Sequence, residues 1–179
     1  MEASVFWSRG ITELTLSFHA IFATLGVGVP LLIFIAQYVG YKKNDMHYTM
    51  MARRWARGFT IIVAVGVVTG TIMGLQLSLL WPSFMEMAGR VIALPLFMET
   101  FAFFFEAIFL GIYLYTWDRF KDPIKHMLLL LPVMIGASMS AIFITIVNAF
   151  MNSPQGFDIE AGEIVNIHPV LAMITPAMP

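Results

Sequence analysis

Four apolar stretches dominate the sequence, and each is longer than the roughly 20 residues that an α-helix needs to cross the hydrocarbon core of a bilayer. Because 59% of the residues are hydrophobic and only 12% are charged, the chain cannot cover itself with a polar surface. We therefore predict an all-α integral membrane protein with a bundle of four transmembrane helices. The spans run from about Leu14 to Tyr41, Phe59 to Leu80, Ile92 to Trp117 and Met127 to Met151.

The segments on either side of this bundle, which covers residues 13–151, are shorter. Residues 1–12 are too short and too polar to span a membrane, and apolar side chains such as Trp7 favour a short helix lying in the interface. Residues 152–179 carry turn signals and are interpreted as an external loop leading to a further span that the chain does not contain. We therefore expect the chain to be the opening part of a longer protein.

The basic residues are distributed unevenly between the connections. Eight of the ten Lys and Arg residues lie in the two connections that follow the first and third stretches, and only Arg9 and Arg90 fall elsewhere. The positive-inside rule places those two connections in the cytoplasm, so both ends of the segment are expected on the outer side. The net charge of −1 offers no basic field for nucleic acid, and the absence of cysteine excludes disulfides and thiolate metal sites.

Three ionisable side chains lie well inside the apolar stretches, where such groups are costly and indicate function by default. They are His19, Glu99 and Glu106. Seven helical residues turn through about 700°, so the two glutamates project from one stripe, about 10 Å apart along the axis. They must face protein, water or metal. A proton relay is the favoured interpretation, and a pair of buried, hydrogen-bonded acids is the alternative.

His19 has two interpretations that the residues alone leave open. A neutral imidazole suits an axial position on haem iron, but polar side chains in membranes also serve simply as hydrogen-bonding partners between helices. With the topology above, His19, Glu99 and Asn148 lie in the outer third of the membrane, and Glu106 and Ser140 lie nearer its midplane. This arrangement suits a path that carries protons from the cytoplasm to a redox centre.

Small residues in the second stretch predict a flat helix face. Gly66 and Gly70 form a GxxxG pattern, which Gly74 continues at the same spacing. Close packing of a neighbouring helix is the favoured interpretation, and room for a porphyrin is the alternative. Pro30 predicts a bend in the first stretch.

A series of short motifs follows along the chain. They are Ser8-Arg9, Phe18-His19, Gly66 to Gly70, Pro95 to Glu99, Phe103 to Glu106, Trp117 to Arg119, Ser140-Ala141 and Asn148 to Pro154. In this order and spacing, over essentially the whole chain, they resemble the N-terminal part of subunit I of the cytochrome bd-type quinol oxidases. Each motif alone is weak, but the ordered set is specific.

The resemblance implies a role for each matching polar residue. His19 is expected to be the axial ligand of a haem in the high-spin pair, where oxygen is reduced, and Glu99 to lie beside that pair as a further iron ligand or as the final proton donor. Glu106 and Ser140 are expected to form the proton path leading to it.

The resemblance also implies cofactors and partners. Arg9 is expected to pair with a haem propionate, as suits an interfacial guanidinium, and Asn148 to line the same polar region. The implied cofactors are high-spin and low-spin haem b and haem d, with quinol as electron donor. The implied partners are subunit II of the oxidase, membrane lipid and dioxygen, with a small single-span subunit as a further candidate. The implied location is a bacterial or archaeal cell membrane.

The implied activity is that of a terminal quinol:dioxygen oxidoreductase, which reduces oxygen to water with protons drawn from the cytoplasm. The sequence departs from the family in several respects. Family members are more than twice as long, and the histidine and methionine ligands of the low-spin haem and the quinol loop would fall beyond Pro179. His168 does not match that histidine's position, and Gly74 stands where some members carry a carboxylate.

The alternative is a non-catalytic four-helix membrane protein, such as a cytochrome b-like anchor or a transporter fragment. A diheme anchor offers two histidines per haem, whereas here only His19 lies within a predicted span and His47 and His126 are expected in the connections. A transporter more often shows broken helices in matched halves, and the sequence shows no such pairing.

Overall fold

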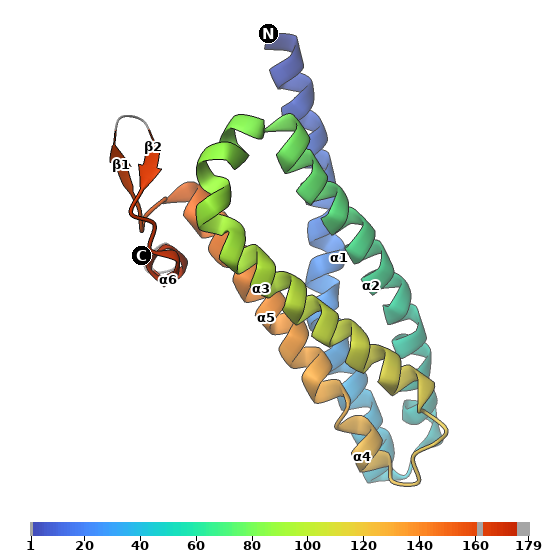
Figure 1. Cartoon of the computed structure of the whole chain (residues 1–179). Helices are drawn as coiled ribbons and strands as arrows, with labels where there is room; N and C mark the ends of the chain where they lie inside the picture. The colour runs from blue at the N-terminus through green and yellow to red at the C-terminus, as the bar shows by residue number, and fades with distance from the viewer. Residues whose placement is uncertain (1, 161–162, 175–179) are drawn as a thin grey trace.

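The computed structural model describes residues 2–160 and 163–174, and its dominant feature is a bundle of long helices (Figure 1). Four helical segments are long and apolar enough to cross a membrane, with α4 and α5 together forming the fourth. The predicted all-α membrane bundle is therefore confirmed. The elements are α1 (Glu2–Lys43), α2 (Met46–Leu80), α3 (Pro82–Tyr115), α4 (Pro123–Met127), α5 (Leu130–Asn152), β1 (Asp158–Glu160), β2 (Glu163–Val165) and α6 (Pro169–Ile174).

Helix α1 is longer than the sequence suggested. Residues 2–12 are not a separate helix but the first turns of α1, which then continues without interruption to Lys43. At 1.5 Å per residue its 42 residues extend about 63 Å, about twice the thickness of the hydrocarbon core. Pro30 lies inside α1 without ending it, and Asn44, whose φ is positive at 50°, follows the last residue of the helix at the basic connection.

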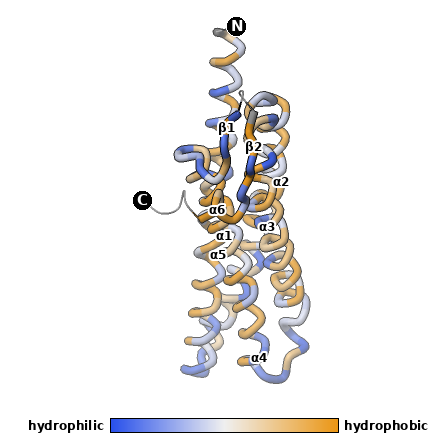
Figure 2. Tube along the Cα trace, turned by 60° about the vertical axis from the view of Figure 1, so that its left-hand side comes forward, coloured by the Kyte–Doolittle hydropathy of each residue, from blue (hydrophilic) through white to orange (hydrophobic). Residues whose placement is uncertain are grey.

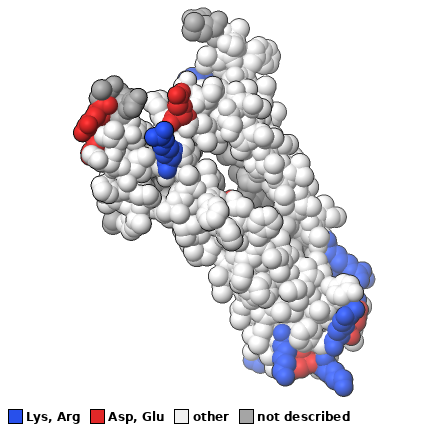
Figure 3. Space-filling view, in the orientation of Figure 1, with Lys and Arg blue, Asp and Glu red and all other residues white. Residues whose placement is uncertain are grey.

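The connections at the basic end of the bundle are short and capped. The Asp45 carboxylate accepts a hydrogen bond from the backbone N–H of His47 at the start of α2, and Asp122 caps α4 in the same way through Ile124. Arg53 of α2 donates two hydrogen bonds to Asp118 in the α3–α4 connection. Figure 3 shows Lys and Arg side chains gathered around this end of the molecule.

The long helices form two antiparallel pairs, α1 with α2 and α3 with α5, and the pairs meet at the basic end (Figure 1). The main apolar core lies there and draws on all four helices. It comprises Ile33, Ala36, Ala52, Ala56, Phe59, Leu110, Tyr113, Leu130 and Val133. In this half of the bundle apolar contact between the pairs holds the fold together.

The two pairs separate toward the opposite end. Among the described residues, Pro30 is the first buried apolar side chain of α1 and Phe59 is the last of α2. The second apolar core lies instead within the α3–α5 pair and beneath α6, and includes Val91, Val147 and Ala172. Figure 3 shows a hollow in the surface between the two pairs in this region.

The segment after α5 is more ordered than the predicted loop. Strands β1 and β2 form an antiparallel hairpin in which Ile159 pairs with Ile164, and α6 begins at Pro169. The hairpin and α6 lie beside the ends of α3 and α5 that are remote from the basic connections (Figures 1 and 2). Phe157 and Ile164 pack against the second core, which explains why this short polar segment is ordered. Residues 161–162 and 175–179 of the predicted loop lie outside the described part.

Candidate functional site

His19 lies on α1 where the two helix pairs separate, and its imidazole is half-buried. Its Nδ1 is 2.8 Å from the hydroxyl of Thr69 on α2. The ring also lies over Gly70, where an added Cβ would be only 3.2 Å from His19 Cε1. The GxxxG face of α2 therefore accommodates an imidazole at this level. That contact comes from helix α1, but an added Cβ at Gly66 or Gly74 would meet nothing within 4 Å, so the predicted close packing is seen only at Gly70.

Glu99 and Glu106 both face α5, as their seven-residue spacing predicts. Ser140 Oγ of α5 donates a hydrogen bond of 2.9 Å to Glu99 Oε1. Glu106 is only 5% exposed and packs against Gly136, where an added Cβ would come within 2.9 Å of the Glu106 backbone nitrogen. Gly136 and Ser140 are one helical turn apart, so each contacts one of the two acids.

Ser140 differs in position from the sequence-based expectation. It lies level with Glu99, to which it is bonded, and not nearer the midplane together with Glu106. The group that lies level with Glu106 is Gly136, which has no side chain and so leaves this acid without a partner hydroxyl at that point. The two residues lie about 10 Å apart along the axis of α3.

The three ionisable groups nevertheless form one site. The Glu99 carboxylate lies within electrostatic range of both His19 and Glu106. An imidazole from one helix pair thus lies within electrostatic range of an acid from the other, in the region where the pairs separate. Within the described residues no three His, Asp or Glu side chains cluster as a cage for a bare metal ion. An imidazole in this place could bind a metal cofactor, and the hydrogen-bonded acid near it could supply a proton.

Arg9 and Asn148 are not brought into this site. Arg9 is exposed on the N-terminal part of α1, about 15 Å along the helix from His19. The Asn148 side chain is exposed on α5, and its backbone carbonyl accepts a hydrogen bond from the Asn152 side chain. Their roles toward a haem stay predictions.

Gln76 is a further polar residue of the separated region. Its Nε2 donates a 2.9 Å hydrogen bond to Thr15 and so ties α2 to α1. Its Oε1 is buried and has no hydrogen-bond partner within the described part of the chain. A buried unpaired acceptor costs free energy, so Gln76 Oε1 is a place where a hydrogen-bond donor would stabilise the structure.

A second polar cluster lies buried at the basic end, and the sequence did not predict it. The Tyr113 hydroxyl donates to Gln37 Oε1, and Gln37 Nε2 lies 2.9 Å from His126 Nδ1. His126 Nε2 in turn donates to the Tyr113 carbonyl, and the two rings stack. His126 was expected in a connection but is only 3% exposed. This network joins α1, α3 and α4 with its side-chain polar atoms paired.

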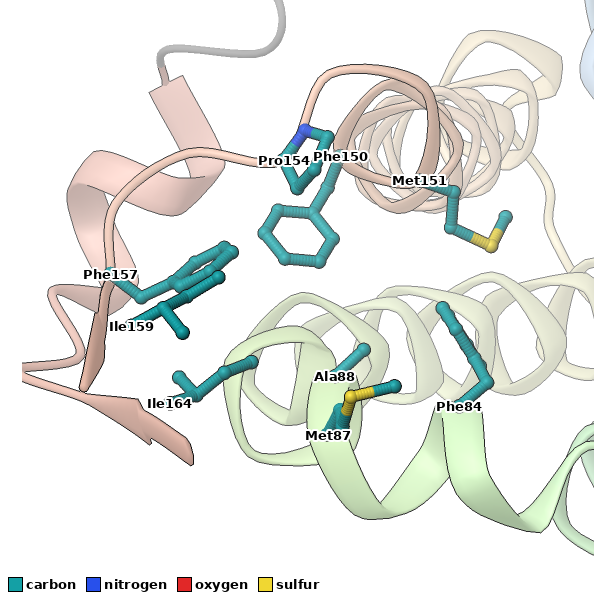
Figure 4. Close-up of a pocket in the computed structure, with 9 residues that line it drawn as sticks. All are labelled: Phe84, Met87, Ala88, Phe150, Met151, Pro154, Phe157, Ile159 and Ile164. Carbon is teal, nitrogen blue, oxygen red and sulfur yellow. The ribbon is translucent and has the colours of Figure 1, made fainter. Parts of the chain in front are cut away.

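An apolar pocket lies apart from these polar groups, between α3, α5 and the hairpin (Figure 4). Its volume is about 230 Å³ and its walls are almost entirely carbon. The lining residues are Phe84, Met87, Ala88, Phe150, Met151, Pro154, Phe157, Ile159 and Ile164. None of these nine is a candidate site residue, so the pocket is separate from the polar site described above.

The sequence alone overlooked Thr69, Gly136 and the buried Tyr113 network. Tyr113 lies seven residues after Glu106, so the stripe that carries both glutamates continues to it, and this spacing was the available signal. Gly136 and Ser140 likewise form a small-xxx-small pattern on α5. Thr69 belongs to one of the quoted motifs, but its contact with His19 depends on how α1 and α2 are rotated against each other.

The sequence matches the family "Cytochrome bd terminal oxidase subunit I" over residues 7–179. The chain belongs to this family. Its resemblance to subunit I of the cytochrome bd-type oxidases is thereby confirmed, and the non-catalytic membrane anchor or transporter loses its support.

Individual relatives of this subunit I chain agree. It is 45% identical over 170 residues to a candidate cytochrome bd menaquinol oxidase subunit I of Bacillus subtilis. This match covers 95% of the chain and 38% of the relative. It is 33% identical to the cytochrome bd-II ubiquinol oxidase subunit 1 of Escherichia coli over 86% of the chain and 30% of that relative.

A solved structure shows the same fold. The bd oxidase from Geobacillus thermodenitrificans superimposes with a TM-score of 0.93 at 72% sequence identity, covering 98% of this chain and 41% of the solved chain. The chain thus spans between 30% and 41% of the length of these relatives. It is a multi-pass membrane protein of a respiratory oxidase family.

Proposed function

We propose that this chain is the N-terminal part of the haem-bearing subunit of a terminal quinol oxidase, and that its polar site serves oxygen reduction. The observation that carries the proposal is that His19 and Glu99, which come from different helix pairs, lie within electrostatic range of each other where the pairs separate. The family's names, which include menaquinol and ubiquinol oxidases, agree with quinol as the reductant.

The residues present fit a haem. Nδ1 of His19 lies 2.8 Å from the Thr69 hydroxyl, so Nε2 is the ring nitrogen that this contact leaves free. The absence of a Cβ at Gly70 makes room for the imidazole, and the space between the helix pairs is hollowed. His19 would hold the iron through Nε2, and Glu99 would face the same centre as a second ligand or as a proton donor. When bound, the haem group supplies the iron at which dioxygen is reduced.

The remaining steps concern protons held by the chain itself. Glu106 is buried and receives protons from the cytoplasmic side in this proposal, because the basic connections lie at that end. Glu99 delivers them, and Ser140 orients its carboxyl group through the 2.9 Å hydrogen bond. Since about 10 Å separates the two acids, a proton moves between them through an intervening group such as water.

The wider assignments follow the family. Both ends of this segment lie on the outer side of a bacterial or archaeal cell membrane in this proposal. Arg9 pairs with a haem propionate, and Asn148 lines the polar region near it. The cofactors are high-spin and low-spin haem b and haem d. The partners are subunit II, membrane lipid, quinol and dioxygen, with a small single-span subunit as a further candidate.

Replacing His19 by alanine in the complete oxidase tests the proposal. The high-spin haem bands in the visible spectrum should disappear, because the axial ligand is lost. His47→Ala is the matched control, because His47 is exposed at the start of α2 and lies far along the chain from the site. An unchanged spectrum in the His19 variant would refute the assignment.

A further inference from the structure

We propose that Thr69 is a positioning residue for His19, which fixes the tautomer and the orientation of the imidazole so that Nε2 is the ligating nitrogen. The inference rests on the proposed function, in which His19 holds a haem iron. It concerns a residue that neither the family match nor the relatives' names assign.

The hydrogen-bond pattern around the Thr69 hydroxyl determines which nitrogen carries the proton. Thr69 Oγ1 lies 2.8 Å from the carbonyl of Val65, 3.1 Å from that of Gly66 and 2.8 Å from Nδ1 of His19. A hydroxyl has one hydrogen, and carbonyl oxygens can only accept. Because Thr69 Oγ1 is the donor to both helix carbonyls, we assign His19 Nδ1 as the donor to Thr69.

This assignment has a direct consequence for metal binding. A neutral imidazole carries one proton, so a proton on Nδ1 leaves the lone pair on Nε2. In the opposite tautomer, Nδ1 would have no hydrogen and would be an acceptor. It would then lie against Thr69 Oγ1, which is also an acceptor because its own hydrogen is donated to the helix backbone. The α2 backbone thus selects the ligating nitrogen through a single side chain.

Burial and packing strengthen the constraint on the ring. Thr69 is 8% exposed and is one of four buried polar side chains in the described part of the chain. The next residue, Gly70, lies against the ring, and an added Cβ there would be 3.2 Å from Cε1 and 3.8 Å from both ring nitrogens. The imidazole is held by a hydrogen bond at one edge and by bare backbone along its face.

A second threonine on the same helix shows that the backbone bond alone is not what matters. Thr71 Oγ1 donates to the carbonyl of Val67 over 2.9 Å, as Thr69 does to Val65, but Thr71 is exposed. The two residues share their local conformation and differ in whether a histidine meets the hydroxyl. Thr71 is therefore a matched control.

Partners of this kind tune metal ligands in general. A hydrogen bond from the second ring nitrogen orients the imidazole and raises its basicity, and its loss typically weakens metal binding by about 10–100-fold. We expect the same scale for Thr69→Val, which keeps the shape of the side chain but removes the hydroxyl. Thr69→Ser keeps the hydroxyl and should preserve the native state.

The test uses the complete oxidase with three readouts other than turnover. These are the haem content per complex, the rate of haem loss to excess apomyoglobin, and the iron–histidine stretching frequency of the reduced high-spin haem. Thr69→Val should lose haem about 10–100-fold faster and show a lower stretching frequency. Thr69→Ser and Thr71→Val should match the wild type in all three. Thr69→Ala, which adds no buried methyl group, replaces the valine variant if that variant does not assemble.

The outcomes separate the two proposals. If Thr69→Val and Thr69→Ala retain haem and frequency while His19→Ala loses the haem, His19 remains the ligand and the positioning role of Thr69 is refuted. If Thr69→Ser is shifted as far as Thr69→Val, the hydroxyl is not the cause and the inference is also refuted. An unchanged spectrum in His19→Ala overturns the proposed function itself.

Discussion

Replacing Gly136 by alanine should loosen the α3–α5 pair at the level where it holds the two glutamates. A Cβ at this position would lie 2.9 Å from the carbonyl oxygen of Ala102, 2.9 Å from the nitrogen of Glu106 and 3.0 Å from Glu106 Cβ. Two of these three contacts are with backbone atoms, which cannot rotate away as the end of a flexible side chain can. The helices must therefore move apart.

The displacement can be worked out from these distances. Ordinary van der Waals contact begins at 3.4 Å, so α5 must shift by about 0.5 Å from α3. Ser140 lies one turn further along α5, and the same shift would lengthen its 2.9 Å bond to Glu99 to about 3.4 Å. An O–H···O hydrogen bond rarely exceeds about 3.0 Å. Glu99 would lose its orienting partner.

Two measurements on the complete oxidase check this reasoning. The unfolding temperature should fall, because overpacking of a close contact costs about 1–3 kcal/mol. Oxygen consumption should fall on the order of tenfold, because a proton donor displaced by a fraction of an ångström is poorly placed for transfer. Gly111→Ala on α3 is the control, since a Cβ there meets nothing within 4 Å. Wild-type stability and turnover in Gly136→Ala would show that the helix contact is not as tight as the distances indicate.

Three further predictions concern single side chains. Glu106→Gln should slow oxygen consumption by about 10²–10⁴-fold, as expected for the loss of a proton-transfer group. The visible spectrum should show that haem is retained. Normal turnover in this variant would show that Glu106 takes no part in the mechanism. Tyr113→Phe leaves the buried Oε1 of Gln37 unpaired and should destabilise the subunit by about 1–3 kcal/mol in a thermal unfolding assay. The haem spectrum should not change. An equal loss of stability when Tyr113→Phe is made in a Gln37→Leu background would show that the Tyr113–Gln37 hydrogen bond is not its cause. Asp118→Asn should cost less than about 1 kcal/mol of stability in the same assay. The Asp118 side chain is 71% exposed, so solvent screens its ion pair with Arg53. A larger loss would mean that the ion pair is covered in the assembled oxidase.

The fold was predictable because the apolar length of each stretch dictates a membrane helix. The continuation of α1 through residues 2–12 was not, since its polar composition suggested a break and only the absence of a stop signal argued against one. The hairpin of β1 and β2 was also missed, because its strands are three residues each and owe their order to Phe157 and Ile164 packing on distant helices.

The candidate site was predictable where it depends on one helix. Glu99 and Glu106 share a face because of the helical period, and that follows from sequence alone. Contacts between helices depend on rotation and depth, which hydropathy does not determine. For this reason the partners of His19 and His126 appeared only in the structure, as did the level of Ser140.

The separation of the two helix pairs away from the basic end divides the subunit by depth. The core that joins all four helices lies near the basic connections, whereas His19, Glu99 and Ser140 lie where the pairs no longer share apolar contacts. Substitutions at the first level should therefore reduce the amount of folded subunit, and substitutions at the second should leave folded protein with altered spectra or rates. A plot of mutational effect against position along the membrane normal would show two bands, one for abundance and one for activity.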